Sequence, residues 1–211
     1  MPKNKKRIVT ESKKGKNQVN ARVRFFSQSG QENSSQVIIS GGLLKIFGVG
    51  TLIIGDSGIG KSESSLELIA RGHKFISDDV VEIYRDKEGR LFGRSPQLTK
   101  NFMEIRGLGI INIKEIFGAK AILEEAQIDL VIRLKKWNRK MEADRLGLKI
   151  PEDYLLAGVR IPQLHIPVAP GRNIATLIEV ACRVFILRQK GYLAAQDISR
   201  RLDRKLAEKN G

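Results

Sequence analysis

The sequence predicts an α/β fold with a mixed sheet and with helices at its C-terminal end. An apolar run at residues 51–54 is typical of a buried strand. A glycine-rich octapeptide follows it at residues 55–62, and a helical pattern continues to residue 71. Residues 80–85 and 90–93 predict the two strands of a β-hairpin, so the fold departs from simple alternation of strands and helices.

The remaining elements end at residues typical of their positions. Gly72 follows the first helix, where a left-handed backbone is common. Asn173 is a typical N-cap for a long helix that reaches about residue 190, and Gly191 follows that helix. We also expect an apolar strand at residues 128–134 and a last, basic helix from about residue 194 to 209.

The octapeptide fits the phosphate-binding pattern G-x-x-x-x-G-K-[ST] at every position. Its glycines allow successive N–H groups to point inward, where they meet phosphate oxygens together with the helix N-terminus. A Gly/Ser-rich turn can match by chance, but the strand before it and the helix after it favour a P-loop that binds a phosphoanhydride. The residues predicted to bind the nucleotide are Gly55, Asp56, Ser57, Gly58, Ile59, Gly60, Lys61 and Ser62.

Length and composition bound the organisation of the chain. Its 211 residues, 41% of them hydrophobic, suffice for one domain with a full core and a tail. We expect residues 1–35 to form a basic, disordered tail and residues 36–211 to form the catalytic domain. No apolar run approaches the roughly 20 residues that span a bilayer, and the N-terminal segment is polar, so we expect a cytoplasmic protein with no membrane partner. The single cysteine, Cys182, fits a reducing compartment and a place in the core.

The net charge of +15 comes from 38 Lys and Arg against 23 Asp and Glu. Such a field speeds encounter with an acidic partner, a nucleotide or a nucleic acid. Much of the excess lies at the two ends of the chain, where solvated charge is the default interpretation. The sequence has no aromatic interleaving, zinc-ligand spacing or recognition-helix pattern, which argues against a nucleic-acid partner.

A carboxylate pair, Asp78-Asp79, follows the apolar residues Phe75-Ile76, where a strand is expected to end. Phosphoryl transfer needs an acidic group near the metal and often a base for the attacking hydroxyl. Neighbouring side chains on a strand point to opposite faces, so only one of the two can face the phosphates unless the backbone kinks. Two adjacent Asp residues also commonly form a solvated turn. The P-loop upstream favours a catalytic role for this pair over a solvated turn.

Several segments of the chain together resemble a known family. Residues 55–62, 71–83 and 103–112 look like the HPr kinase/phosphorylase family, and the similarity continues through residues 144–148, 166–173 and the final helices. The resemblance implies a P-loop core related to phosphoenolpyruvate carboxykinase. It implies phosphorylation of a serine of HPr, the phosphocarrier of the sugar phosphotransferase system, by ATP or pyrophosphate. It also implies the reverse phosphorolysis by inorganic phosphate, and a homo-oligomer, a hexamer.

The same resemblance assigns roles to individual residues. It implies that Lys61 contacts the transferred phosphate, that Ser62 and Glu104 hold Mg²⁺, and that Asp79, with Asp78 beside it, is the catalytic base. By microscopic reversibility, the group that takes the serine proton in one direction returns it in the other.

Further basic residues complete this assignment. Arg145 matches a catalytic arginine of the family, although an ordinary ion pair with Glu142 is an open alternative. Arg106 and the segment Pro170, Gly171 and Arg172 are implied in phosphate binding and phosphorolysis, Arg172 at a helix N-terminus.

Three departures from the family pattern leave alternatives open. Ser40 stands where the family carries a catalytic His, and Ala169 stands where it carries an arginine. The chain has only the basic tail where relatives carry a separate N-terminal domain. The site could therefore serve a kinase of another protein or of a small-molecule hydroxyl. A nucleotide-binding regulator without catalysis is the third candidate, although the paired carboxylates argue against it.

Overall fold

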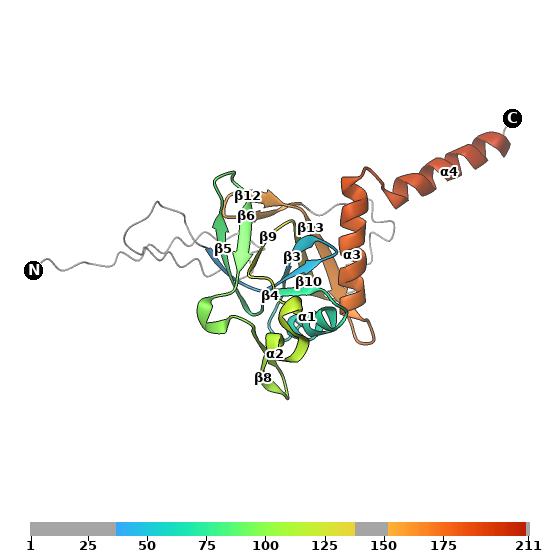
Figure 1. The fold of residues 1–211 in the computed structure, drawn as a ribbon. Helices are drawn as coiled ribbons and strands as arrows, with labels where there is room; N and C mark the ends of the chain where they lie inside the picture. Colours follow the sequence, from blue (N-terminus) through green and yellow to red (C-terminus); the bar gives the residue numbers. More distant parts are fainter. Residues whose placement is uncertain (1–36, 138–151, 210–211) are drawn as a thin grey trace, which may run out of the picture.

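The computed structural model describes residues 37–137 and 152–209, and its central element is a five-stranded mixed sheet (Figure 1). The strand order is β13-β10-β3-β2-β4. Strands β3, β10 and β13 are parallel to one another, whereas β2 is antiparallel to both β3 and β4. The five strands are β2 (Gly42–Ile46), β3 (Val49–Ile54), β4 (Lys74–Ser77), β10 (Leu130–Lys136) and β13 (Gln163–Val168).

A second, antiparallel sheet with the order β1-β5-β6-β9 packs on one face of the first. It contains β1 (Val37–Ser40), β5 (Val80–Arg85), β6 (Leu91–Arg94) and β9 (Glu125–Gln127), so the predicted hairpin is confirmed. Two further hairpins lie outside the sheets: β7 (Phe102–Ile105) with β8 (Gly109–Asn112), and β11 (Tyr154–Leu156) with β12 (Val159–Ile161). Short helical segments connect the strands: Gln97–Thr99, α2 (Ile113–Phe117) and Ala119–Ala121.

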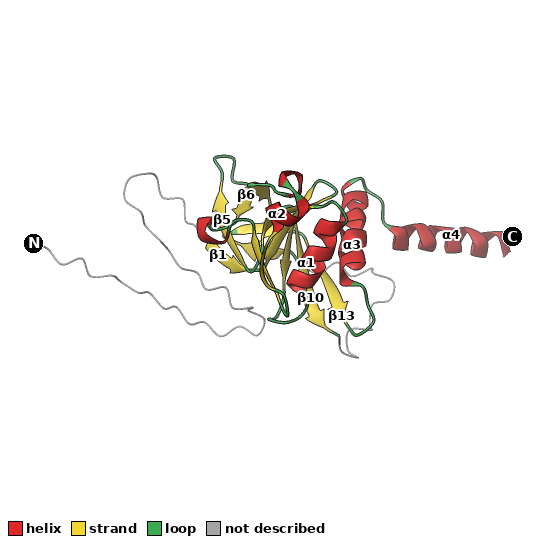
Figure 2. Ribbon diagram, turned by 60° about the horizontal axis from the view of Figure 1, so that its bottom comes forward, coloured by secondary structure: helices red, strands yellow, loops and turns green. Residues whose placement is uncertain are grey.

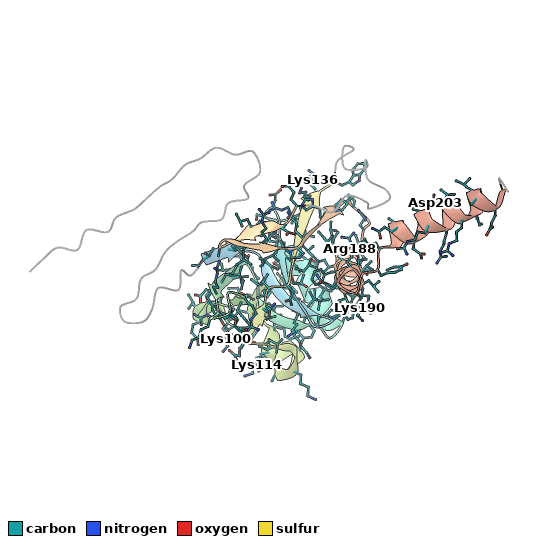
Figure 3. The ribbon with its side chains drawn as sticks, turned by 90° about the horizontal axis from the view of Figure 1, so that it is seen from above. Lys100, Lys114, Lys136, Arg188, Lys190 and Asp203 are labelled. Carbon is teal, nitrogen blue, oxygen red and sulfur yellow. The ribbon has the colours of Figure 1, made fainter. Side chains whose placement is uncertain are left out.

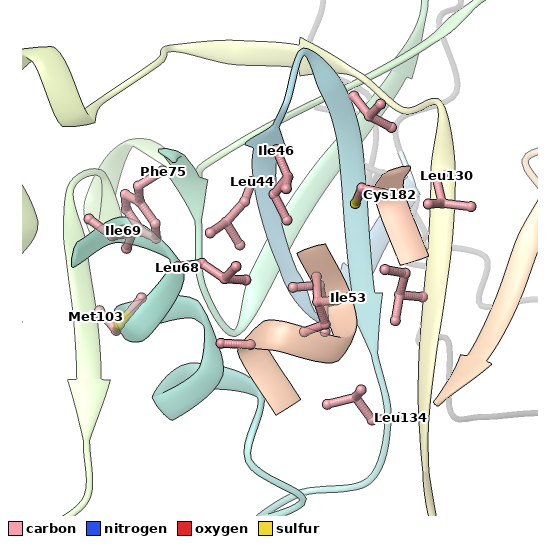
Figure 4. Packing of buried hydrophobic residues seen from close by; sticks show 14 of the residues in the cluster. Leu44, Ile46, Ile53, Leu68, Ile69, Phe75, Met103, Leu130, Leu134 and Cys182 are labelled. Carbon is pink, nitrogen blue, oxygen red and sulfur yellow. The ribbon is translucent and has the colours of Figure 1, made fainter. Parts of the chain in front are cut away.

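Helices α1 (Lys61–Ala70) and α3 (Ile174–Gln189) cover the opposite face of the five-stranded sheet (Figure 2). Alternation along the buried strands divides the core in two. Ile53 and Leu134 face the helices and share a core with Leu68 of α1 and Cys182 of α3 (Figure 4). Leu52 and Ile54 face the second sheet. The fold is thus a helical layer, a mixed sheet and an antiparallel sheet, which confirms the predicted α/β class.

The C-terminal helices begin and end close to where the sequence predicted. Asn173 caps α3 by accepting a hydrogen bond from the Thr176 amide at 2.7 Å, and Gly191 follows the helix with a φ of 81°. Helix α4 (Ala194–Lys209) extends away from the two sheets (Figure 1). Among the described residues, no helix is both long and apolar enough to cross a membrane.

Strand β10 begins two residues later than predicted. Asp129, which the prediction placed inside the strand, uses its carboxylate to accept a hydrogen bond from the Gly50 amide at 2.8 Å. Leu130 is then the first residue to pair with β3. The predicted basic tail at residues 1–35 lies outside the described residues and stays a prediction.

Candidate functional site

The glycine-rich loop connects β3 to α1 at the carboxyl edge of the parallel strands, where open α/β sheets bind their ligands. Gly58 and Gly60 have φ values of 73° and 101°, a left-handed region that only glycine enters at little cost. Gly60 is the N-cap of α1, and its carbonyl accepts a hydrogen bond from the Ser64 amide at 3.1 Å. The N-terminus of α1 therefore points at the predicted phosphate position.

The lysine of the loop is held by the loop itself. Lys61 Nζ donates hydrogen bonds to the carbonyl oxygens of Gly55 and Asp56, each at 2.9 Å. A Cβ at Gly55 would lie 2.8 Å from the carbonyl oxygen of Leu134, so only glycine allows the loop to start this close to β10. The ammonium group is thus kept at the rim of the loop, within reach of an incoming phosphate.

Asp78 lies at the end of β4 and is buried beneath the loop. Asp78 is 6% exposed, and its carboxylate lies next to Gly42, where an added Cβ would be 3.4 Å away. Burial raises the pKa of Asp78 to about 6, against the opposing effect of a hydrogen bond from Ser62, and the neighbouring Asp79 charge adds to the rise. In the part of the chain that the structure describes, Asp78 Oδ2 and the hydroxyl of Ser65 are buried without hydrogen-bond partners. Unpartnered buried oxygens beside Ser62 are what a metal ion or an ordered water would satisfy.

Asp79 is separated from Asp78 by a kink in the backbone. Its φ is 63°, its carbonyl accepts a hydrogen bond from the Gly41 amide at 3.0 Å, and the Val80 amide donates to the Asp78 carbonyl at 2.7 Å. The kink leaves Asp79 exposed while Asp78 is buried. The two carboxylates therefore occupy different environments: one contacts the loop, and the other faces solvent at the mouth of the site.

The β7–β8 hairpin brings Arg106 to the loop. Met103 and Ile105 are buried in the helix-side core, which fixes the hairpin against α1. The Arg106 guanidinium lies beside Gly58, since a Cβ at Gly58 would be 3.0 Å from Arg106 Nη2. Glu104 alternates with the buried residues and is exposed on the same strand.

The predicted metal ligands are all hard oxygen donors. A Mg²⁺ site commonly uses one or two protein carboxylates together with substrate phosphates, and Ser62, Glu104 and the nearby Asp78 fit that chemistry. Among the described residues, no group of three or more His, Cys, Asp or Glu side chains is arranged to hold a metal alone.

The segment implied in phosphorolysis follows β13 at the same carboxyl edge. Gly171 has a φ of 79°, and Arg172 donates from Nη1 to the Pro167 carbonyl at 2.9 Å. Within the described residues, no hydrogen bond joins Pro170, Gly171 or Arg172 directly to the loop. The predicted catalytic Arg145 lies outside the described residues.

A polar network that was not predicted from the sequence joins α3 to α1, the helix that follows the loop. Arg71 contacts Glu67 at 2.5 Å and Glu179 at 2.6 Å, and His73 Nε2 lies 2.8 Å from Glu179. The spacing of Glu67 and Arg71, four residues apart on one helix, was the available signal. Their partners on α3 are more than a hundred residues away in sequence.

Together, the fold and the site define a P-loop protein with a buried carboxylate behind the loop and an exposed one at its mouth. Comparison with known families makes this more specific. The chain belongs to the family described as HPr Serine kinase C-terminal domain, whose model matches residues 31–202.

Individual relatives agree with this assignment. The chain is 43% identical over 180 residues to HPr kinase/phosphorylase of Thermoanaerobacter sp. (strain X514), an alignment that covers 85% of this chain and 58% of that protein. It is 51% identical over 166 residues to the HPr kinase/phosphorylase of Halalkalibacterium halodurans, with 78% and 53% covered. The chain thus spans between half and two thirds of the length of these curated relatives.

A solved structure is also similar. The Hpr(Ser) kinase/phosphatase from Coxiella burnetii superposes with a TM-score of 0.68 at 33% sequence identity. The match covers 78% of this chain and 97% of that one.

Proposed function

We propose that the chain phosphorylates a serine of HPr with ATP or pyrophosphate and catalyses the reverse phosphorolysis with inorganic phosphate. The observation that carries this proposal is the intact P-loop with Asp78 buried against Ser62 and Asp79 exposed beside it. A protein that only bound a nucleotide would not need the second, exposed carboxylate.

In the forward direction, Asp79 accepts the proton of the serine hydroxyl as the serine oxygen attacks the terminal phosphorus atom. The bond between that phosphorus and its bridging oxygen breaks, and ADP or phosphate leaves with the electron pair. Lys61 exchanges the carbonyls of Gly55 and Asp56 for oxygens of the transferred phosphate, and Arg106 stabilises charge on the same group. Mg²⁺, held by Ser62 and Glu104, would neutralise charge on the phosphates.

In the reverse direction, an oxygen of inorganic phosphate attacks the phosphorus of phosphoserine. The serine oxygen leaves and takes its proton from Asp79, and the products are serine and pyrophosphate. Arg172 and the segment Pro170-Gly171 supply the site for the incoming phosphate in this proposal, and Arg145 clamps the reacting group.

The test is a phosphotransfer assay with Mg²⁺, ATP or pyrophosphate and purified HPr, read as a mass shift. Asp79→Asn should reduce transfer in both directions at least a hundredfold, the usual order for loss of a general base. Asp203→Asn, a neutralised carboxylate on the distant helix α4 (Figure 3), is the matched control and should keep full activity. An active Asp79→Asn variant would show that another group is the catalytic base. A wild-type protein that binds nucleotide but does not phosphorylate HPr would exclude HPr as the acceptor.

A second candidate is a kinase that acts on another hydroxyl. Ser40 pairs with Val80 next to the two carboxylates, so the position where the family carries a catalytic His lies beside the proposed base. Ala169 follows β13, where a missing cation would weaken capture of phosphate. If HPr is the acceptor, Ala169→Arg should raise the phosphorolysis rate more than the kinase rate, and unchanged phosphorolysis would contradict this idea.

We also propose a homohexamer in the cytoplasm, which rests on the family resemblance. Size-exclusion chromatography with light scattering tests the assembly, and a monomer at micromolar concentration would contradict it.

A further inference from the structure

A cluster of basic side chains lies beside the P-loop on strands β10 and β13. Arg133 pairs with Ile54 of β3 and with His165 of β13, and Lys135 pairs with Pro167. Residues opposite one another on paired strands point to the same face of a sheet. Arg133, Lys135 and His165 therefore share the face on which Ile54 packs against the second sheet, and we name these three residues the β10 cluster.

The β10 cluster is level with the start of the loop. Ile54 is the last residue of β3, and the loop begins at Gly55, in contact with Leu134. Lys135 is the next residue along β10. Its neighbour Lys136, labelled in Figure 3, is exposed and points to the opposite, helix-covered face by strand alternation.

Each cation of the β10 cluster lies near a neighbouring ring. Lys135 Nζ lies 3.3 Å from His165 Nδ1, and the Arg133 guanidinium lies 5.3 Å from the centre of the Tyr154 ring. Burial and the two neighbouring cations lower the pKa of His165 to about 4, so its imidazole is neutral at pH 7 and can accept a hydrogen bond from Lys135. Burial and the Arg133 charge also lower the pKa of Lys135.

Within the described residues, no carboxylate forms an ion pair with Arg133 or Lys135. Arg133 and Lys135 are partly buried and repel one another, and a bound anion would relieve that repulsion. This is the electrostatic arrangement of a docking surface for negative charge.

The position of Asp79 determines which anion fits. Asp79 lies in the connection from β4 of the first sheet to β5 of the second, and the second sheet packs on the face that the β10 cluster shares. Strands β10 and β4 are three positions apart in the sheet, which is roughly 14 Å at the usual strand spacing. A single phosphate ion cannot bridge that distance. The second sheet covers β3 and β2 on this face, but an extended peptide segment of about four or five residues that runs along the carboxyl edge of the sheet can span it.

We propose that Arg133 and Lys135 dock an acidic segment of the protein acceptor that lies about four or five residues from the phosphorylated serine. The proposal rests on the proposed function, since it assigns the chemistry of the acceptor to that same site. His165 orients Lys135 by accepting its hydrogen bond, and Tyr154 supports the Arg133 guanidinium.

The first experiment measures HPr phosphorylation at 50 and 200 mM NaCl. Lys135→Gln should raise KM for HPr about three- to tenfold at low salt, with kcat and KM for ATP unchanged, and the difference should shrink at high salt. Lys135→Arg should restore KM. Lys136→Gln, the same charge change on the opposite face, is the matched control and should leave KM unchanged. An unchanged KM for Lys135→Gln, or an equal effect of Lys136→Gln, would overturn the proposal.

The second experiment does not depend on HPr. A fluorescein-labelled serine peptide with four glutamates on one side of the serine is titrated with the full chain, and binding is followed by fluorescence anisotropy. The wild-type chain should bind it several-fold more tightly than Lys135→Gln and than a matched peptide with glutamines. If HPr is not phosphorylated but this difference in peptide affinity appears, HPr is excluded as the acceptor and the docking surface for an acidic segment is supported. Equal binding of both peptides overturns the docking surface.

Discussion

Glu67 accepts a hydrogen bond at 2.8 Å from the side-chain amide of Asn173, and this contact joins helix α1 to the residue that caps α3. The same carboxylate pairs with Arg71, which also donates to Thr176 at 3.0 Å and contacts Glu179. The Asn173 hydrogen bond is the largest of the effects that lower the pKa of Glu67. The network therefore fixes the turn before α3 relative to the helix that follows the P-loop.

Asn173→Ala is expected to lower the free energy of unfolding by about 1–2 kcal/mol, because it removes the N-cap of α3 and the hydrogen bond to Glu67. Asn173→Ser keeps a capping oxygen but has no amide donor, so it should cost roughly half as much. Urea unfolding followed by circular dichroism measures both. An alanine variant as stable as the wild-type protein would contradict the role of the cap.

Gly58→Ala should weaken nucleotide binding at least tenfold. The new Cβ must adopt a φ of 73°, which costs about 1–2 kcal/mol, and it would lie 3.0 Å from Arg106 Nη2. Titration with a fluorescent ATP analogue measures the Kd. Gly89→Ala is the control, because Gly89 has a φ of 82° but lies in open space in the β5–β6 turn. The prediction fails if both variants bind the nucleotide as tightly as the wild-type protein does.

Local patterns were enough to predict the elements around the loop. The strand before the loop, the helix after it, the β5–β6 hairpin and the Asn173 cap each depend on residues close in sequence. The pairing of β13 with β10, and the second sheet that covers Ile54, depend on contacts between distant segments. No local pattern encodes those contacts, so the sheet order could not be predicted from propensity.

The candidate site also combines features that local sequence predicts with features that depend on contacts between distant segments. The sequence identifies Asp78 and Asp79 as a pair of carboxylates. It also predicts that both can face the phosphates only if the backbone kinks there. The kink is held by Gly41, whose amide donates a hydrogen bond to the Asp79 carbonyl, and the Asp78 carboxylate lies next to Gly42. Both belong to a region of the chain nearly forty residues earlier, so the burial of Asp78 could not be read from its neighbours.

Cys182 should not react with thiol reagents while the protein is folded. The thiol is fully buried and lies 3.4 Å from the Thr51 hydroxyl, and burial raises its pKa to about 11. Mass spectrometry after iodoacetamide treatment at pH 8 should find no label in buffer and one label per chain in 6 M guanidinium. Rapid labelling of the folded protein would contradict a core position.

Asp78 is expected to make the nucleotide-free protein less stable as the pH rises from about 4 to about 6. Its pKa is about 6 in the folded state and near 3.8 in the unfolded chain. Between these two pH values the folded state binds a proton that the unfolded chain does not, and this stabilisation of the folded state is lost as the pH rises through about 6. Each pH unit between the two values corresponds to about 1.4 kcal/mol, so the loss is on the order of 3 kcal/mol.

Asp78→Asn removes this titration. The variant should therefore match the wild-type protein near pH 4 and be more stable than it at pH 7.5, in the absence of metal and nucleotide. The comparison requires urea unfolding at pH 4, 5, 6 and 7.5 with EDTA, and Asp203→Asn serves as the exposed control that keeps the wild-type slope. Since Asp78 adjoins Ser62 of the loop, the stabilised variant should also bind Mg²⁺-nucleotide more weakly, which is the expected conflict between stability and function at a buried carboxylate. Parallel curves for Asp78→Asn and the wild-type protein would show that the carboxylate titrates near its ordinary pKa.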